Sequence, residues 1–600
     1  MCSAEIKEIF MKPQYSKKCR YGIWLILCIA GMVIFDRSLV FVPNQGFNAH
    51  MKVAVVINVF AIGIFPVLMT FVPGLTYVTD CMLAAFAAWI RCVRANWRKA
   101  GFYVLLVAGA WLLSFVLEYL VVAKLLSQEA NASRQALIFT VLLLGIVIYG
   151  FRNRAGSRPE QFYLITALIL GGFLIWVSPA TLGTMNDDEV HYLRTIEEAN
   201  FFDGARLEVE NKLMTEYEAT IFDKFAYDRE SRKEYYAELN ALYDEKKVDH
   251  PDYFERAIYS IAYLPAAIGT IVGEGLSLSF VHVFMMGKFF NLLCYALLIY
   301  FAIRRIRYGK VLLAAFGLLP TNLYMAANYS YDPWVIGWIV LAFAYYFEEI
   351  QNPDRPLQWK NVICMVVFLL LGCMPKAVYC VMALPFLFMP KKKFASKKMR
   401  MCYYLPVIIA GTALLGSFLI PVLANGAGAG DVRGGTGVNA DAQLAYIFAH
   451  PGEYMGVLAR FLKQYLSVGN AQSYLQMYFH FGNGAFVGTT LSILVVTAFL
   501  DRQPEETLGF GVRLSTFAAG ILAVVACATA MYIAYTSVAS AEIGGCQGRY
   551  FLPAVFPILM AIAPDRIDNR MNRNVFTMVP LMMLAGTFLY NIYGFCVCLY

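Results

Sequence analysis

Long apolar runs recur along this chain and set the strongest limit on what it can fold into. The run FYLITALILGGFLIWVSPATLG, residues 162–183, contains no charged side chain and is long enough to cross a bilayer as a helix. Similar runs, separated by short polar segments, follow one another along most of the 600 residues. A β-barrel would instead show short segments of alternating polarity. The pattern therefore predicts an all-α, polytopic membrane protein with about 15 transmembrane helices.

The composition agrees with this class. Hydrophobic residues make up 60% of the chain and charged residues 15%, and the mean hydropathy is +0.58. Soluble globular proteins contain about 25% charged residues, so a soluble fold is excluded. The 14 cysteines are scattered, mostly inside apolar runs, at spacings that match no metal site. They are interpreted as small buried hydrophobic residues.

Clusters of lysine and arginine indicate the orientation of the spans, because basic residues concentrate in cytoplasmic loops. The basic segment 7–20 places the N-terminus in the cytoplasm. Residues 52–90 are interpreted as one span followed by an interfacial segment, which leaves the cluster RCVRANWRK (91–99) inside. Residues 257–273 are too short a run to cross and are expected to form a juxtamembrane or re-entrant element on the outer side. This path places the C-terminus outside.

Half of the acidic residues lie in one segment. Residues 183–256 contain 20 of the 41 acidic residues and 10 of the 49 basic residues. Such a segment is too polar for the membrane, and its part rich in Glu, Lys, Tyr and Leu, residues 208–247, predicts one or two external helices. The basic excess elsewhere is attributed to cytoplasmic loops, not to nucleic-acid binding.

The predicted path divides the chain into six parts. These are an N-terminal four-span extension (1–159), the first core span (160–182), an external helical loop with the juxtamembrane element (183–280), core spans (281–424), an external loop with an interfacial helix (425–480) and C-terminal spans (481–600). The protein is expected in the plasma membrane as a multi-pass protein. The unusual polar residues at the ends of spans gather on the predicted outer face.

The segment NDDEVHYLR (186–194) follows directly on the first core span. On a regular helix, Asp187, Asp188, His191 and Arg194 would share one face and could meet one ligand. Carboxylates at an apolar boundary suit a general base or a ligand of a divalent cation. The alternative is that the two aspartates begin the helix as N-terminal capping residues.

Three more polar sites lie on the same predicted face. Lys376 in MPKAVY could bind a phosphate, or could extend toward lipid headgroups. Gln547 and Arg549 in GGCQGRYFLP offer donors beside three glycines, although a tight loop is the simpler interpretation. Asp332 in NYSYDPW begins a span, and capping of the helix before Pro333 is preferred to a ligand contact.

The external loop contains NGAGAGDVRGGTG (425–437), which lacks the GxxxxGK[ST] pattern of a nucleotide-binding P-loop. It is expected to be a mobile outer loop that could become ordered over a substrate. The next segment, HPGEYMGVLARFLKQYL (450–466), is expected to form an amphipathic interfacial helix.

The motifs follow one another in a specific order: DDEVHYLR, YLPAAIG, GKFFNLL, LLPTNLYMAANYSYDPW, PKAVY, AYIFAHPGEYMGVL and GGCQGRYFLP. This order resembles a family of bacterial polytopic membrane proteins of unknown function, over about residues 160–600. Its layout is similar to the GT-C superfamily of polyprenyl-phosphate-dependent glycosyltransferases. Lys288, in GKFFNLL, stands where relatives more often have arginine.

The resemblance implies transfer of a sugar from a polyprenyl-phosphate donor to a glycan or lipid-linked acceptor outside the cytoplasm. By this match Asp187 is the expected catalytic base and Asp188 its partner, and the pair could ligate Mg²⁺ or Mn²⁺. Lys376 and Arg549 would hold the donor phosphate. The expected substrate contacts are His191, Arg194, Tyr263, Asp332, Lys376, Gln547 and Arg549.

Two other functions stay open. A transporter or flippase for lipid-linked glycans would carry polar residues at mid-membrane and two related halves. In this sequence the unusual residues gather on one face, and no internal repeat is evident. A non-catalytic component of an envelope-polymer assembly would keep the fold but tolerate the loss of Asp187.

Overall fold

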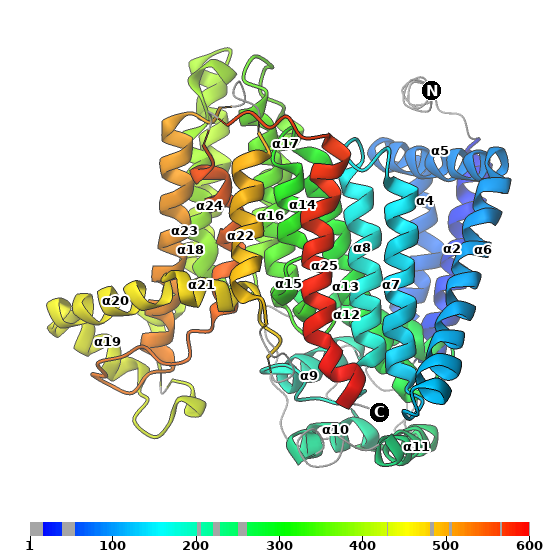
Figure 1. Cartoon of the computed structure of the whole chain (residues 1–600). Helices are drawn as coiled ribbons and strands as arrows, with labels where there is room; N and C mark the ends of the chain where they lie inside the picture. The colour runs from blue at the N-terminus through cyan, green and yellow to red at the C-terminus, as the bar shows by residue number, and fades with distance from the viewer. Residues whose placement is uncertain are drawn as a thin grey trace.

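A computed structural model describes residues 16–38, 55–200, 206–219, 229–249, 261–428, 430–479, 485–502, 507–564 and 567–598. The basic N-terminal segment up to residue 15 and residues 257–260 of the expected juxtamembrane element lie outside these ranges. The described chain is almost entirely helical, and most helices run side by side in one bundle (Figure 1). Two short strands, β1 (Arg206–Leu207) and β2 (Val248–Asp249), pair antiparallel. The predicted all-α class is confirmed.

Eight helices of the described residues are long and apolar enough to cross a membrane. They lie in α2 (Lys17–Ser38), α6 (Trp97–Phe115) with its continuation η2 (Val116–Leu125), α7 (Ala132–Phe151), α8 (Pro159–Val177), α13 (Phe280–Arg305), α18 (Lys397–Asn425), α23 (Phe510–Ala534) and α25 (Arg573–Cys598). This confirms a multi-pass membrane protein. The number of about 15 spans stays a prediction, because several further apolar helices are shorter than the roughly 20 residues that a perpendicular span needs.

Further helices, most of them shorter, fill the bundle and its ends. They include η1 (Phe60–Ile64), α4 (Phe65–Phe71), α14 (Lys310–Gly317), α15 (Pro320–Ala326), α16 (Asp332–Gln351), α17 (Trp359–Cys373), η5 (Ala377–Phe388), η6 (Lys391–Lys393), α22 (Val487–Leu500), η8 (Gly548–Phe551) and α24 (Leu552–Ile562). Residues of α13, α14 and α16 form the centre of the core, where Ala296, Phe316 and Phe343 are fully buried. Gly317 allows this packing, because a Cβ atom there would lie 2.5 Å from the ring of Tyr163 in α8.

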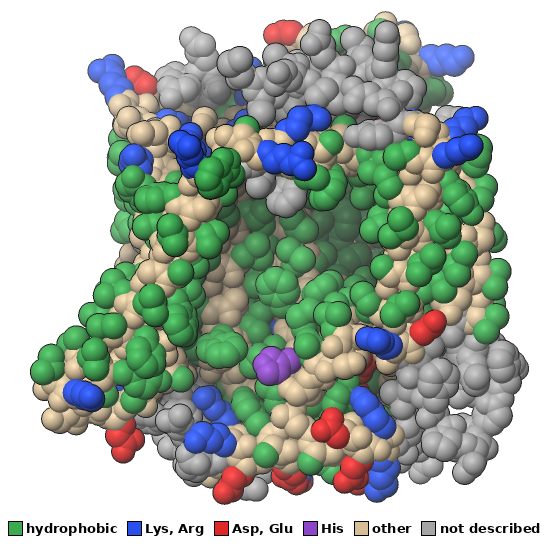
Figure 2. Space-filling model, turned by 90° about the vertical axis from the view of Figure 1, so that its right-hand side faces the viewer, with side chains coloured by type: hydrophobic (Ala, Val, Ile, Leu, Met, Phe, Trp, Pro, Cys, Tyr) green, Lys and Arg blue, Asp and Glu red, His purple; other side chains and the backbone are tan. Residues whose placement is uncertain are grey.

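The segment after the second predicted span is helical. The chain leaves α4 and forms α5 (Pro73–Ala95), which lies across one end of the bundle (Figure 1). Figure 2 shows Lys and Arg side chains along this end and a band of hydrophobic side chains below it. The band is hollowed at mid-height and hydrophobic side chains line the hollow. One span followed by an interfacial segment stays the prediction for residues 52–90.

The expected juxtamembrane element forms the short helix α12 (Leu264–Gly275). It packs closely along α13, since a Cβ atom on Gly269 would lie 2.4 Å from the carbonyl oxygen of Met286. Twelve helical residues extend about 18 Å, well short of the roughly 30 Å hydrocarbon core. This length agrees with the prediction that the segment does not cross the membrane.

Three helices gather at the bundle end opposite α5 (Figure 1), here called the α9 end. They are α9 (Asp188–Ala199), α10 (Glu208–Ala219) and α11 (Arg229–Glu245). Leu213 of α10 and Leu239 of α11 are fully buried in a small core that also contains Tyr192 of α9. Among the described residues of 208–247 there are two helices, α10 and α11, within the predicted one or two.

The segment between α18 and α22 forms an arm that projects sideways from the bundle at the α9 end (Figure 1). The projecting part contains η7 (Val432–Gly434), α19 (Ala440–Ala449) and α20 (Pro451–Tyr465), whereas α21 (Val468–Leu475) lies back against α22 (Figure 1). Tyr454 and Leu458 of α20 pack against Tyr532 at the end of α23 and anchor the arm. The helix predicted for residues 450–466 is α20.

Candidate functional site

Asp187 begins the site, at the residue where the chain enters α9. Its backbone is left-handed, with φ of +65°, a conformation that aspartate tolerates better than most residues. The carboxylate makes no helix-capping hydrogen bond. It accepts one hydrogen bond from Arg549 Nη2 at 2.6 Å and another from Arg433 Nη1 at 3.1 Å. Asp187 thus occupies the N-cap position of α9, as the capping alternative expected, but its side chain, 29% exposed, does not cap the helix.

A second carboxylate lies deeper. Asp332, at the start of α16, lies 3.2 Å from Arg549 Nε through Oδ2 and 3.2 Å from Lys376 Nζ through Oδ1. The N-cap of α16 is Tyr331, and no side-chain cap is formed. The preferred capping account of Asp332 is thus wrong, because the carboxylate is engaged by two cations instead. Arg433, Asp187, Arg549, Asp332 and Lys376 form one alternating series, here called the ion-pair chain.

The ion-pair chain is assembled from segments far apart in the sequence. Arg549 comes from η8, Lys376 from the residue before η5, and Arg433 from η7. The Arg549 side chain is 3% exposed and that of Lys376 16%. Such buried charges are tolerated only when each has a partner, so removal of one member leaves another uncompensated.

Two aromatic rings hold the Lys376 ammonium. Its Nζ lies 3.7 Å from the ring centroid of Tyr550 and 4.9 Å from that of Tyr331. Both rings attract a cation through their negative faces. Lys376 therefore points into the protein, and the alternative in which it extends to lipid headgroups is not the observed conformation.

His191 lies on the next turn of α9 and packs behind the ion-pair chain. Its Nδ1 lies 3.0 Å from the Tyr263 hydroxyl, and its ring meets the ring of Tyr331 edge-on at 4.9 Å. Its Nε2 is buried without a hydrogen-bond partner. Burial, and then the positive charge of Arg549, lower the pKa of His191 to about 3. His191 is therefore neutral at physiological pH, and it lies buried behind the pocket side of the ion-pair chain.

The remaining residues of the opening motif have other partners. Asp188 accepts hydrogen bonds from the Gly183 and Met185 amides and the Thr184 hydroxyl, at 2.7, 3.1 and 3.0 Å. Arg194 Nη1 donates to Glu197 Oε2 at 2.8 Å. Of the four residues predicted to share one face, the structure brings Asp187 and His191 together with Asp332, Lys376 and Arg549.

A pocket of about 420 Å³ opens beside the ion-pair chain. Its lining residues are Asp187, Tyr331, Pro375, Lys376, Ala377, Val378, Asp431, Arg433, Cys527, Ala530, Met531, Tyr535, Gly545, Gln547 and Tyr550. One part of the pocket lining is charged, with Asp187, Lys376 and Arg433. Another part, with Val378, Ala530 and Met531, is apolar. Gln547, a predicted contact, carries a buried Oε1 without a hydrogen-bond partner. Arg549 and Asp332 are buried behind Asp187 and Lys376 and are not among the lining residues.

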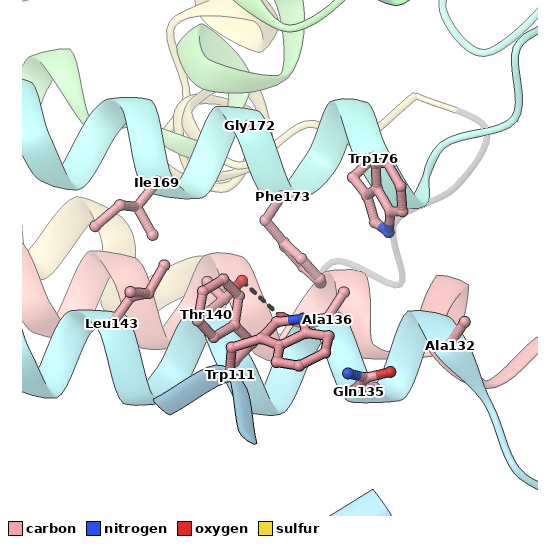
Figure 3. Close-up of a pocket in the computed structure, with 11 residues that line it drawn as sticks. Trp111, Ala132, Gln135, Ala136, Thr140, Leu143, Ile169, Gly172, Phe173 and Trp176 are labelled. Atoms are coloured by element: carbon pink, nitrogen blue, oxygen red, sulfur yellow. Dashed lines mark hydrogen bonds between the residues drawn. The ribbon is translucent and has the colours of Figure 1, made fainter. Parts of the chain in front are cut away.

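A pocket of similar size, about 440 Å³, lies between α6, α7 and α8 (Figure 3). Trp111, Phe173 and Trp176 contribute aromatic rings, and no lining side chain is charged. Figure 3 shows the Phe173 and Trp176 side chains projecting from α8 into the space toward α7. An apolar site of this kind suits a hydrocarbon chain but not acid–base chemistry, so the pocket at the ion-pair chain is the candidate active site.

Residues 168–558 match the profile of the family described as Predicted membrane protein (DUF2142). The chain belongs to this family. The match begins within α8, ends within α24 and includes every member of the ion-pair chain. No curated protein and no solved structure matches the chain. The predicted relationship to a family of membrane proteins is confirmed, and the similarity to GT-C enzymes stays a proposal.

The sequence did not identify Arg433 and Asp431 as site residues, although both lie within residues 168–558. The glycine-rich loop is docked onto the end of α23, where the Asp431 amide donates to the Ala534 carbonyl at 2.7 Å. Asp431 also pairs with Arg433 at 2.6 Å, which directs Arg433 over Asp187. A signal was present, because these two residues are the only charged ones in NGAGAGDVRGGTG.

Asp187 and Asp188, the pair expected from the sequence to bind Mg²⁺ or Mn²⁺, also lie within residues 168–558. Among the described residues, no group of three or more His, Cys, Asp or Glu side chains is placed to hold a metal ion. Asp187 and Asp188 direct their carboxylates to different partners. Binding of Mg²⁺ or Mn²⁺ by this pair stays a prediction.

Proposed function

We propose that this protein is a GT-C-type membrane glycosyltransferase. It would transfer a sugar from a polyprenyl-phosphate donor to a cell-envelope glycan or lipid-linked acceptor on the outer face of the plasma membrane. One observation carries the proposal: a single pocket combines the Asp187 carboxylate, the cations Lys376 and Arg433, and an apolar wall. A lipid phosphate that carries a sugar needs these three surfaces together.

The two lining cations would bind the donor phosphate. Lys376 presents an ammonium that is fixed between two tyrosine rings, and Arg433 presents a guanidinium from the glycine-rich loop. Hydrogen bonds from such cations to phosphate are charge-assisted and strong. Because the Arg433 side chain is 57% exposed, it can exchange Asp187 for a phosphate without leaving a buried charge unpaired.

The apolar wall would receive the first isoprene units of the donor. Val378 belongs to η5, and Ala530 and Met531 belong to α23, a helix long enough to cross the membrane. These side chains lie in the same pocket as Lys376. A donor bound with its phosphate at Lys376 could therefore extend its tail along η5 and α23 toward the lipid.

In the proposed reaction, Asp187 removes the proton from an acceptor hydroxyl as the hydroxyl oxygen attacks the anomeric carbon of the donor sugar. The bond between that carbon and the phosphate oxygen breaks, and its electron pair leaves with polyprenyl phosphate. Lys376 and Arg433 stabilise the negative charge that develops on the leaving group. A positioned base contributes about 10²–10⁴-fold to such a step. Arg549 is buried behind Asp187 and holds its carboxylate in place.

The proposed orientation places the α9 end outside the cell. The basic cluster 91–99 lies at the opposite end, with α5, which supports a cytoplasmic position for that end. The C-terminal helix α25 ends at the α9 end (Figure 1). The predicted number of about 15 spans and the GT-C-like layout are parts of this proposal.

The test compares purified wild type with Asp187→Asn and with Asp354→Asn, a matched carboxylate-to-amide change at a 96% exposed side chain. Each protein is given a panel of radiolabelled polyprenyl-phosphate sugars and an envelope extract of the host, with and without EDTA. We expect transfer by wild type and Asp354→Asn, a loss of about 10²-fold or more in Asp187→Asn, and a metal requirement only if EDTA abolishes transfer. Equal transfer by all three proteins would show that Asp187 is not the base. No transfer with any sugar would count against the enzyme and favour a flippase or an assembly component.

A further inference from the structure

A groove of about 340 Å³, distinct from the two pockets described above, lies directly behind one wall of the candidate active site. Its lining residues are Val457, Arg460, Phe461, Gln464, Tyr465, Asn470, Tyr474, Ala541, Glu542, Ile543 and Cys546. Gly545 and Gln547 line the active-site pocket, and Cys546 between them lines this groove. A single extended segment thus separates the two spaces.

Three aromatic residues that pack on one another form part of the lining of this groove. The Phe461 and Tyr465 rings stack at 4.9 Å with an interplanar angle of 26°, and the Tyr465 and Tyr474 rings lie 4.8 Å apart. Aromatic faces bind apolar surfaces of ligands without losing much side-chain entropy, because a tyrosine has only two side-chain torsions to order. Tyr465 is 4% exposed between its two neighbours, so the partly exposed Phe461 and Tyr474 supply the aromatic surface that a ligand can contact.

Polar groups surround these rings. Arg460 and Asn470 supply donors, Glu542 supplies acceptors, and Gln464 supplies both. Hydrogen bonds to the backbone hold two of these side chains in place. Arg460 Nη2 donates to the backbone carbonyl of Ala541 at 3.2 Å, and Asn470 Nδ2 donates to the backbone carbonyl of Gln464 at 2.6 Å. This mixture of donors and acceptors suits a ligand with many hydroxyl groups, each of which both donates and accepts.

The groove is joined to the active site through its aromatic residues. The Tyr465 hydroxyl donates to the Gln547 carbonyl at 2.7 Å. The Tyr474 ring lies against Gly548, where a Cβ atom would come within 1.9 Å of it. Gly548 is followed by Arg549, which holds Asp187. A ligand in the groove would therefore contact the side chains that position the segment 547–549.

We infer that this groove binds part of an oligosaccharide, with a pyranose ring packed against Phe461 and Tyr474 and hydroxyl groups bonded to the polar rim. A pyranose has C–H groups on its faces and hydroxyls around its edge, which matches the two surfaces of the groove. Its volume lies in the range of about 300–1,000 Å³ that small-molecule sites occupy. As a subsite for the growing acceptor glycan, this assignment rests on the proposed function, whereas glycan binding itself does not.

The test measures binding of the host's own envelope polysaccharide, released by mild acid, size-fractionated and fluorescently labelled, to the full-length protein in nanodiscs. The double variant Arg460→Ala/Gln464→Ala removes two rim groups from the exposed face of α20 and should weaken binding by about 10-fold or more. Lys463→Ala is the matched control, since Lys463 is an exposed neighbour on α20 that does not line the groove. Wild type and the control should bind alike.

The outcomes separate the groove from the catalytic proposal. Saturable binding that the rim variant weakens and Asp187→Asn preserves supports the groove, even if no variant transfers sugar, in which case only the enzyme proposal fails. If wild type transfers sugar while the rim variant keeps both its glycan affinity and its acceptor KM, the groove assignment is wrong. Failure of every polysaccharide fraction to bind wild type would also overturn it.

Discussion

Arg549 Nη2 donates a 2.6 Å hydrogen bond to Asp187 Oδ2 although the two residues are 362 positions apart in the sequence. The same guanidinium lies 3.2 Å from Asp332, so one buried cation joins the outer carboxylate to the inner one. This contact determines where Asp187 points and couples the start of α9 to η8. The stability and the proposed chemistry of the site therefore depend on the same side chain.

Replacement of Arg549 by methionine should destabilise the protein by about 3–5 kcal/mol, because it leaves Asp332 buried with one cation fewer. Arg549→Lys keeps the charge but loses the planar fork, and should fall between wild type and Arg549→Met. Thermal unfolding in detergent measures both. Arg570→Met is the control, since the Arg570 side chain is 90% exposed in its pair with Asp568. If Arg549→Met unfolds at the wild-type temperature, the ion-pair chain does not stabilise the fold.

Asp188→Asn should lower the free energy of unfolding by about 1–3 kcal/mol. The carboxylate accepts three hydrogen bonds from residues 183–185, and an amide group would direct N–H toward one of those donors. Sugar transfer per folded molecule should change far less than in Asp187→Asn. A variant with wild-type stability and no transfer would instead support the catalytic partnership that the sequence suggested for Asp188.

The protein should lose stability on acidification through His191. Burial lowers the pKa of His191 to about 3 in the folded protein, against about 6.5 in an unfolded chain. Below pH 6.5 the unfolded chain therefore takes up a proton that the folded protein does not, and unfolding becomes more favourable. The effect approaches 1.4 kcal/mol per pH unit, or about 2 kcal/mol between pH 6.5 and pH 5. Unfolding measured across this range should show a flatter pH dependence in His191→Gln, whereas the exposed His282→Gln should retain the wild-type slope.

Two glycines of the motif GGCQG should respond differently to alanine. At Gly548 a Cβ atom would lie 1.9 Å from the Tyr474 ring, so Gly548→Ala must displace either the ring or the backbone before Arg549. We expect a loss of about 1–3 kcal/mol and weaker sugar transfer. At Gly544 the nearest heavy atom would be 3.7 Å away, and Gly544→Ala should behave as wild type. Equal stability of both variants in thermal unfolding would contradict the observed packing of Tyr474.

The sequence identified several members of the site individually. Ionisable residues beside apolar runs are costly in free energy to place near a membrane and usually have a function. On this basis the sequence indicated Asp187, Asp332, Lys376 and Arg549 as candidates. It could not distinguish Asp187 from Asp188, since both were assigned to one regular helix. The left-handed backbone at Asp187 breaks that regularity and turns the two carboxylates toward different partners. Nor could it assign Arg433 to the site, because the path of a glycine-rich loop depends on the surface where it docks.

The amino-acid sequence by itself determined the membrane class, the helical architecture and the separation of an acidic segment from the apolar spans. These properties follow from the length, hydropathy and charge of neighbouring residues, which are local quantities. Only the tertiary structure decided which charges pair and which carboxylate faces the pocket. Those outcomes depend on packing between α9, η5, η7, η8 and α16, which brings residues hundreds of positions apart within hydrogen-bonding distance.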